Sequence, residues 1–255
     1  MFYNPMPPAS TPVRAWVEAA AHLRAQPNLT LGGLMLHIEH PLTTDADEEA
    51  VIMTVDRFLR QHEAYPIVTV ANTIFPSSLD RGDGVDALRE RYLDVYKRRM
   101  CTPGEWGRYF ERMVNWKDRK GGRIDQLAEN IRMLNDARIG RFYENRYEII
   151  ISDPARDLRK ALNRQCLSMI ELKPERSGSL HMIALYRNHY YVQKTLGNLL
   201  GLGRLLGFIA RESGFEVGTL TVNSTSARLD TEGWGKADVT TLIDNCTARL
   251  VREAA

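Results

Sequence analysis

The second half of the chain alternates segments that have the pattern of buried strands with one long apolar helix. The strand-like segments are RYEIIIS, CLSMIEL, LHMIALYR and TLTVNST, and a helix is expected from about Leu196 to Glu212 between the last two. Strands and a helix of this kind must each cover an apolar face, and a helix packed on one face of a sheet satisfies both. The pattern therefore predicts an α+β fold with a sheet core backed by helices.

The first half adds amphipathic helices to this core. Apolar residues follow a helical spacing after Thr11, from Asp45 to His62 and from Asp86 to Arg99, and a further helix is expected from Ile124 to Leu134. The segments LTLGGLMLHIEHPL and YPIVTVANTIF are predicted to be strands, the second of them buried. Because no stretch has the length and composition of an interdomain linker, residues 1–255 are expected to fold as one domain.

Composition and charge exclude several classes of protein. A formal net charge of +2 is far from the basic balance of proteins that bind nucleic-acid polymers, but it leaves room for a small anionic ligand. The three cysteines, Cys101, Cys166 and Cys246, lack metal-ligand spacing and suit a reducing compartment. No signal-peptide pattern and no long apolar run is present, so we expect a cytoplasmic protein without a membrane span.

Two cofactor motifs are weakly represented. The glycines of GNLLGLGRLLG do not open a helix after a strand, as a phosphate-binding loop requires, and are expected instead to allow close packing of a buried helix. His37 and His40 flank Glu39, but no Pro-Cys-x-x-Cys follows them as it does in zinc deaminases. We therefore predict neither a dinucleotide loop nor a metal site.

Cys166 and Arg187 hold the positions that most suggest chemistry. Cys166 begins a strand pattern two residues after Arg164, and a nearby cation favours the thiolate, the form that attacks electrophiles. Taken alone, such a cysteine is more often a small core residue. Arg187 ends the apolar pattern LHMIALYR, where a charge is costly unless it is paired or bound to an anion, so a phosphate ester is a fitting ligand.

Three stretches between residues 106 and 230 resemble thymidylate synthase and the related pyrimidine nucleotide hydroxymethylases. WGRYFERMVNWKDRKGGRIDQLAENIRML resembles a Tyr-Gly-x-x-Trp-Arg-x-Trp run followed by Ile-Asp-Gln and a helix, and NRQCLSMIEL resembles a strand that opens with Pro-Cys-His. LHMIALYRNHYY, a helix and FEVG together resemble a Leu-Tyr-Gln-Arg-Ser strand, a Pro-Phe-Asn helix start and a Leu-Glu-Val-Gly end. The resemblance implies a thymidylate synthase-like mixed sheet backed by helices, with residues 1–100 as a divergent N-terminal part.

The resemblance also implies roles for individual residues. Cys166 falls on the nucleophile that attacks C6 of a pyrimidine nucleotide, and Arg187 falls on the arginine that binds the phosphate. Counting back from Gly218 places Asn198 on the asparagine that recognises the pyrimidine edge. In this family each site borrows two arginines from the neighbouring subunit, which implies a homodimer, and Arg146 is the better placed candidate.

The sequence departs from the family at several of these positions. Leu167 replaces the histidine after the nucleophile, and Tyr190 replaces the aspartate that holds folate, which argues against methylene-tetrahydrofolate as the cofactor. The His-x-Tyr pair that contacts the sugar hydroxyl becomes Arg228 and Asp230, so ribose and deoxyribose both stay open.

The glutamate that relays protons around the ring has no counterpart by spacing. Glu105, Glu111 and Asn72 are candidates to replace it.

Together these observations predict a C5-modifying transferase that acts on a pyrimidine nucleotide. Addition of the Cys166 thiolate to C6 makes C5 nucleophilic, so that C5 accepts a one-carbon unit or exchanges its hydrogen. Asn198 would stabilise the charge that develops on O4, and an asparagine there favours uracil over cytosine.

Three alternatives stay open. The chain could be a folate-independent enzyme of modified-nucleoside biosynthesis on the same scaffold. It could be a nucleotide-binding or regulatory protein that lacks catalysis. It could also be an unrelated α+β protein whose short matches are accidental.

Overall fold

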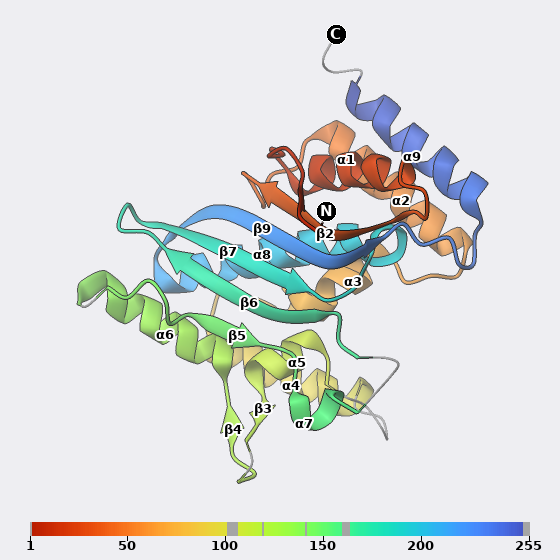
Figure 1. The fold of residues 1–255 in the computed structure, drawn as a ribbon. Helices are drawn as coiled ribbons and strands as arrows, with labels where there is room; N and C mark the ends of the chain where they lie inside the picture. Colours follow the sequence, from red (N-terminus) through yellow and green to blue (C-terminus); the bar gives the residue numbers. More distant parts are fainter. Residues whose placement is uncertain (1, 101–106, 119, 141, 160–163, 252–255) are drawn as a thin grey trace.

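A seven-stranded mixed sheet forms the centre of the computed structural model, which describes residues 2–100, 107–118, 120–140, 142–159 and 164–251 (Figure 1). The strands of this sheet are β1 (Asn4–Pro5), β2 (Thr30–Ile38), β5 (Glu148–Ile150), β6 (Leu167–Pro174), β7 (Ser179–Tyr186), β8 (His189–Tyr190) and β9 (Glu216–Arg228). A separate hairpin pairs β3 (Trp116–Lys117) with β4 (Arg123–Ile124).

The order of strands across the sheet is β1-β2-β9-β7-β6-β5, and β8 pairs with the end of β9. The β7–β9 and β1–β2 pairs are parallel, whereas β2–β9, β6–β7 and β5–β6 are antiparallel. The sheet is therefore mixed, and helices cover it, as the sequence predicts.

Helices lie against one face of the sheet and at both of its ends (Figure 1). Their bounds are α1 (Pro12–Arg24), α2 (Ala46–Gln61), α3 (Ile67–Ile74), α4 (Val85–Arg99), α5 (Tyr109–Val114), α6 (Gln126–Ile139), α7 (Pro154–Asp157), α8 (Leu196–Ser213) and α9 (Lys236–Val251), with a 3-10 turn at Ser77–Leu79 and a π-helical turn at Tyr191–Thr195. α1, α2 and α9 gather at the β2 end, and α6 lies beside β5 at the other end.

Capping residues start the first two long helices where the sequence predicts them. The Thr11 hydroxyl accepts a hydrogen bond from the backbone N–H of Arg14 at 3.3 Å. Asp45 and Glu48 form a reciprocal capping box at the start of α2. These contacts satisfy backbone N–H groups that have no partner inside the helix.

The segment YPIVTVANTIF is the main error of the sequence prediction, because most of it forms helix α3 and not a buried strand. Its β-branched residues pack against α8 at positions where α8 has glycine. A Cβ at Gly197 would lie 2.7 Å from Val70, and one at Gly201 would lie 2.7 Å from the Ala71 carbonyl oxygen. The helix–helix contact therefore overrides the strand propensity of the segment. The expectation that these glycines allow close packing is confirmed.

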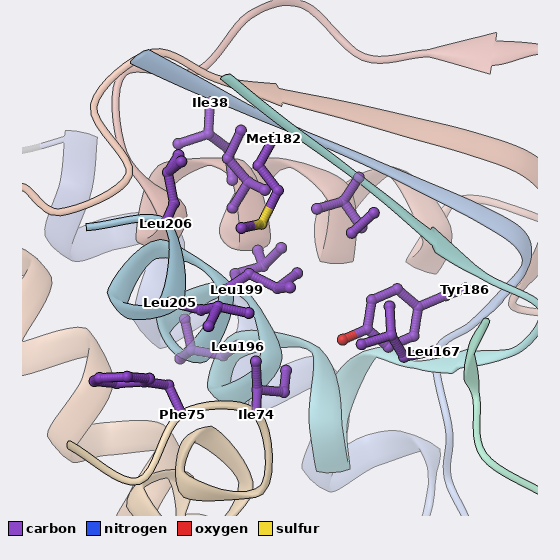
Figure 2. Close-up of a cluster of buried hydrophobic side chains, with 14 of the residues drawn as sticks. Ile38, Ile74, Phe75, Leu167, Met182, Tyr186, Leu196, Leu199, Leu205 and Leu206 are labelled. Atoms are coloured by element: carbon purple, nitrogen blue, oxygen red, sulfur yellow. The ribbon is translucent and has the colours of Figure 1, made fainter. Parts of the chain in front are cut away.

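α8 carries apolar side chains on more than one side, so it occupies the middle of the core. Figure 2 shows Leu206 below Ile38 and Met182, with Ile74 and Phe75 on the opposite side of the helix. All five side chains are buried. Burial of a leucine-sized side chain contributes about 1.5–3 kcal/mol. α8 is therefore a firmly packed support for the residues of its first turn.

Among the described residues, none of the helices combines the length and the apolar character that a bilayer crossing needs.

Candidate functional site

A cavity of about 570 Å³ opens where the start of α8 meets the ends of β6 and β7. Cys166 lies immediately before β6, Arg187 lies immediately after β7, and Asn198 lies in the first turn of α8. All three line the cavity, and so does Tyr190 of β8. The structure thus brings four of the seven residues predicted for the site to one place.

Backbone pairing between β6 and β7 fixes the distance between Cys166 and Arg187. The Arg187 N–H donates to the Cys166 carbonyl oxygen at 3.0 Å and so continues the antiparallel ladder beyond the strand ends. Cys166 and Arg187 are thereby placed opposite each other in the lining of the cavity.

The guanidinium group of Arg187 is oriented by two backbone carbonyls. Its Nε donates to the Gln165 carbonyl at 2.9 Å, and its Nη2 donates to the Arg164 carbonyl at 2.9 Å. Within the described part of the chain, no carboxylate forms an ion pair with this group. A partly buried, oriented arginine without a counter-ion is suited to an anionic ligand.

Three further cations share the lining with Arg187, namely Arg108, Arg164 and Lys194. The Nε atoms of Arg108 and Arg164 are buried, and among the described residues they have no hydrogen-bond partner. Among the described residues, neither aspartate nor glutamate lines this cavity. The site is therefore strongly positive, and a bound anion would offset the cost of placing these charges together.

The Asn198 side chain is held by a hydrogen bond inside the protein. Its Nδ2 lies 3.0 Å from Nε2 of His189, and His189 Nδ1 lies 2.9 Å from the Ser224 hydroxyl. Burial of the His189 ring lowers its pKa from 6.5 to about 3, so the ring is neutral at physiological pH. A neutral ring carries one acceptor and one donor, and both are used.

Tyr109, at the start of α5, places its hydroxyl beside the cysteine. The oxygen accepts hydrogen bonds from the backbone N–H groups of Cys166, at 3.2 Å, and Leu167, at 3.4 Å. Burial raises the pKa of Tyr109, and the neighbouring Cys166 raises it further. The hydroxyl therefore keeps its proton, which is available for donation on the cavity side.

The electrostatics of Cys166 differ from what the sequence predicts. Burial raises the pKa of the thiol, and the positive charges of Arg187 and Lys194 only partly offset this effect. Arg164, the cation that is close in sequence, is not the one that acts on the sulfur. The side chain is therefore a protonated thiol at neutral pH and must lose its proton before or during attack.

Three predicted contacts lie outside the lining of this cavity. Arg228 forms an ion pair with Glu232 on the surface. Asp230 is 3% exposed and accepts hydrogen bonds from the backbone N–H groups of Val192 at 2.8 Å and Gln193 at 3.2 Å. Asp230 thus supports the π-helical turn beside the cavity.

Arg146 is exposed. Its guanidinium group lies 5.2 Å from the centre of the Tyr143 ring, before β5. The role that the sequence predicts for Arg146 is in a neighbouring subunit, and this role and the substrate contacts of Arg228 and Asp230 stay predictions.

Two candidates for the missing proton-relay glutamate, Glu111 and Asn72, do not line the cavity. Glu111 is buried in α5, where its Oε1 accepts from Asn115 at 3.0 Å and burial raises its pKa. Asn72 lies in α3, and its buried side-chain oxygen has no partner in the described part of the chain. Glu105 lies outside the described residues.

A second cavity, of about 790 Å³, lies between α2, α3 and α8 and is the larger of the two. None of the predicted site residues lines it. Its lining includes the exposed apolar side chains of Leu42, Met53 and Val68. Because size alone does not make a reactive site, the smaller cavity with the thiol and the four cations is the better candidate.

The sequence left several lining residues without a role. Arg108 and Tyr109 belong to the first stretch that resembles the family, so that match was the signal that could have identified them. His189 and Lys194 lie between two predicted elements, and only the folded β8 and π-helical turn show that they face the cavity.

Known proteins that are similar to this chain share the name "Putative thymidylate synthase". A protein of Methanococcoides burtonii named "Putative thymidylate synthase" is 28% identical over 157 residues, which cover 60% of this chain and 67% of that protein. A protein of the same name from Methanosarcina barkeri is 29% identical over 160 residues, 61% of this chain and 69% of that protein.

A third, from Methanothermobacter thermautotrophicus, is 33% identical over 106 residues, 42% of this chain and 45% of that protein. No protein-family model matches the chain. These relatives support the interpretation of the chain as a divergent, thymidylate synthase-like protein.

Proposed function

We propose that this chain has a thymidylate synthase-like fold and modifies C5 of a uracil-type nucleotide after the Cys166 thiolate adds to C6. The observation that carries the proposal is the convergence of Cys166, Arg187 and Asn198 on one cavity that four cations line. Each group answers a different need of the reaction, namely a nucleophile, an anchor for phosphate and a partner for the base.

The chemistry follows from charge. When the sulfur–C6 bond forms, the C5–C6 double bond opens and negative charge spreads over C5 and O4. An amide N–H of Asn198 would stabilise O4, and phosphate bound at Arg187 would hold the ring over the sulfur. C5 can then take a proton or a one-carbon electrophile, after which a proton leaves C5, the sulfur–C6 bond breaks and the aromatic ring is restored.

The Tyr109 hydroxyl is suited to hold a proton during this reaction. Two backbone N–H groups donate to its oxygen, so its own O–H is directed elsewhere. We propose that this hydroxyl holds its own proton or a water molecule near C5. It would take the place of the glutamate that the family uses.

The residues present do not fit methylene-tetrahydrofolate bound in the family manner. Tyr190 occupies the position of the folate aspartate, and among the described residues no carboxylate lines the cavity to accept the N–H groups of a pterin. We therefore propose a one-carbon donor of another class.

The raised pKa of Cys166 favours a second candidate function, nucleotide binding without turnover. A buried protonated thiol in a cavity without a carboxylate is poorly prepared for attack. On this alternative the four cations would still bind a nucleotide, and the thiol would only fill space beside Tyr109.

We also propose a homodimer that assembles through the sheet. α8 packs behind the sheet (Figure 1). On β7, Ile183 alternates with the buried Met182 and Ala184 and is 38% exposed. Single exposed apolar side chains are common on monomers, so the homodimer is proposed mainly from the family resemblance. A sedimentation measurement that gives a monomer at micromolar concentration would contradict this part of the proposal.

The test of catalysis is release of tritium from C5-labelled UMP, dUMP, CMP and dCMP without any one-carbon donor. We expect release from at least one uracil nucleotide by the wild-type protein. Cys166→Ser should fold normally and lose release by at least about a thousandfold, because a hydroxyl is rarely ionised at neutral pH.

The matched control is Cys246→Ala, which removes a buried thiol of α9 far from the lining and should retain release. Release that persists in Cys166→Ser would refute the nucleophile. Nucleotide binding without release in wild type would favour the binding function.

A further inference from the structure

The surroundings of His189 fix its imidazole ring in one position. His189 is 1% exposed, and its ring stacks on Tyr186 with centroids 3.9 Å apart and an interplanar angle of 3°. Tyr191 closes the side at 5.5 Å in an edge contact. The ring has little room to rotate, so its two nitrogens keep their directions toward Asn198 and Ser224.

The hydrogen-bond partners of His189 favour one of its two neutral tautomers. The Nδ2 atom of Asn198 has only hydrogens to give, so Nε2 of His189, 3.0 Å away, must accept. The neutral ring then carries its hydrogen on Nδ1, which donates to the Ser224 hydroxyl at 2.9 Å. Burial that lowers the pKa of His189 to about 3 keeps the ring neutral throughout the physiological range.

This tautomer has a consequence for the Asn198 amide. One N–H of the amide points to His189, which leaves the second N–H and Oδ1 together on the opposite edge. Asn198 lines the cavity, so this donor–acceptor edge is available to a ligand. It complements the O4 and N3–H groups of uracil, whereas the N3 and 4-amino groups of cytosine require the reverse order.

An amide can reverse this order by rotating through 180°. Here the rotation would place Oδ1 against His189 Nε2, and a hydrogen bond could form again only if the ring hydrogen moved from Nδ1 to Nε2 and the Ser224 hydroxyl turned to donate to Nδ1. We propose that His189 is a positioning residue that locks the Asn198 amide and thereby makes the cavity select uracil over cytosine nucleotides. This inference rests on the proposed function, because it assumes a pyrimidine base at Asn198.

Two variants of His189 separate locking from simple packing. His189→Phe keeps an aromatic ring against Tyr186 but has no acceptor for Asn198. His189→Gln offers its side-chain oxygen near the position of Nε2 and serves as the conservative variant. In each protein the Kd values of UMP, dUMP, CMP and dCMP are measured by titration calorimetry.

We expect the wild-type protein to bind uracil nucleotides more tightly than cytosine nucleotides. In His189→Phe the ratio of uracil to cytosine affinity should fall about tenfold, and in His189→Gln most of the ratio should be retained. A merely structural role would weaken both bases alike and leave the ratio unchanged. An unchanged ratio in folded His189→Phe, or a wild type that binds both bases equally, would overturn the inference.

The same experiments distinguish failure of the inference from failure of the proposed function. Cys166-dependent tritium release together with an unchanged ratio would remove only the role of His189. Absence of binding for all four nucleotides would remove both proposals.

If His189→Phe does not fold, nitrogen-15 NMR of the His189 ring in the wild-type protein tests the inference by showing which nitrogen carries the hydrogen. We expect a hydrogen on Nδ1 and an unprotonated Nε2, and a hydrogen on Nε2 would overturn the inference.

Discussion

The wall formed by Cys166, Arg187 and Asn198 and the end of β9 with Arg228 and Asp230 both carry polar residues assigned by the same resemblance. In the wall, Arg187 is held by backbone carbonyls and has no carboxylate partner among the described residues, so its charge is available to a ligand. At the end of β9, Arg228 is paired with Glu232, and Asp230 binds backbone N–H groups. Matching a residue by spacing locates it, but its partners in the fold decide whether it can bind anything else.

Arg187→Ala should have the largest effect on ligand binding. Removal of a charge-assisted contact to phosphate is expected to cost about 1.5–3 kcal/mol, or roughly 10- to 150-fold in nucleotide Kd. Titration calorimetry with dUMP and UMP measures this, and thermal unfolding controls for loss of structure. An unchanged Kd in a folded variant would remove Arg187 from the site.

The pH dependence of C5 hydrogen exchange should be the next largest effect. Because the pKa of the Cys166 thiol is raised, the thiolate is a minor species at neutral pH and grows about tenfold per pH unit. We expect the exchange rate at saturating nucleotide to rise about tenfold from pH 6.5 to 7.5, and to rise further above it. A rate that is flat across this range would contradict attack by a thiol of this kind.

Asp230→Asn should change stability and affect nucleotide binding less than Arg187→Ala does. Burial raises the pKa of Asp230 from 3.8 to about 6. The folded state therefore holds this proton more tightly than the unfolded state, and the contribution of Asp230 to stability is full below pH 3.8 and is lost as pH rises toward 6.

Relative to Asp230→Asn, the wild-type free energy of unfolding should fall by about 1.4 kcal/mol per pH unit through this window, about 3 kcal/mol in total. Urea unfolding of both proteins between pH 4 and 7 measures the difference. A constant difference would show that the carboxylate is not perturbed in this way.

Arg228→Ala should have the smallest effect. Its ion pair with Glu232 is exposed, and such pairs contribute about 0–1 kcal/mol. We expect nucleotide Kd to change less than about twofold. Arg228→Ala is therefore the matched control for Arg187→Ala. A loss as large as that of Arg187→Ala would place substrate at the end of β9 and reverse the comparison.

The sequence was sufficient where periodicity and capping agree with tertiary packing. The helices predicted after Thr11 and from Asp45 are α1 and α2, and the apolar patterns of β6, β7 and α8 give the elements that place the cavity. Because Cys166 and Arg187 lie at the ends of adjacent strands, a correct strand prediction with the resemblance was enough to bring them together.

The remaining features depend on contacts that a single sequence does not contain. α3 is a helix because Val70 and Ala71 pack on glycines of α8, which is a tertiary choice against local propensity. The raised pKa of Cys166 comes from burial, and the role of His189 comes from hydrogen bonds to residues nine and 35 positions away. The spacing of residues along the sequence predicts neither effect.

The most direct test of the account is a crystal structure of the chain with bound dUMP or UMP. We predict the phosphate against Arg187, the O4 and N3 edge against Asn198, and C6 within about 3.5 Å of the Cys166 sulfur, the range of a near-attack arrangement. A nucleotide whose phosphate lies at Arg228, or whose base is turned away from Cys166, would contradict the account.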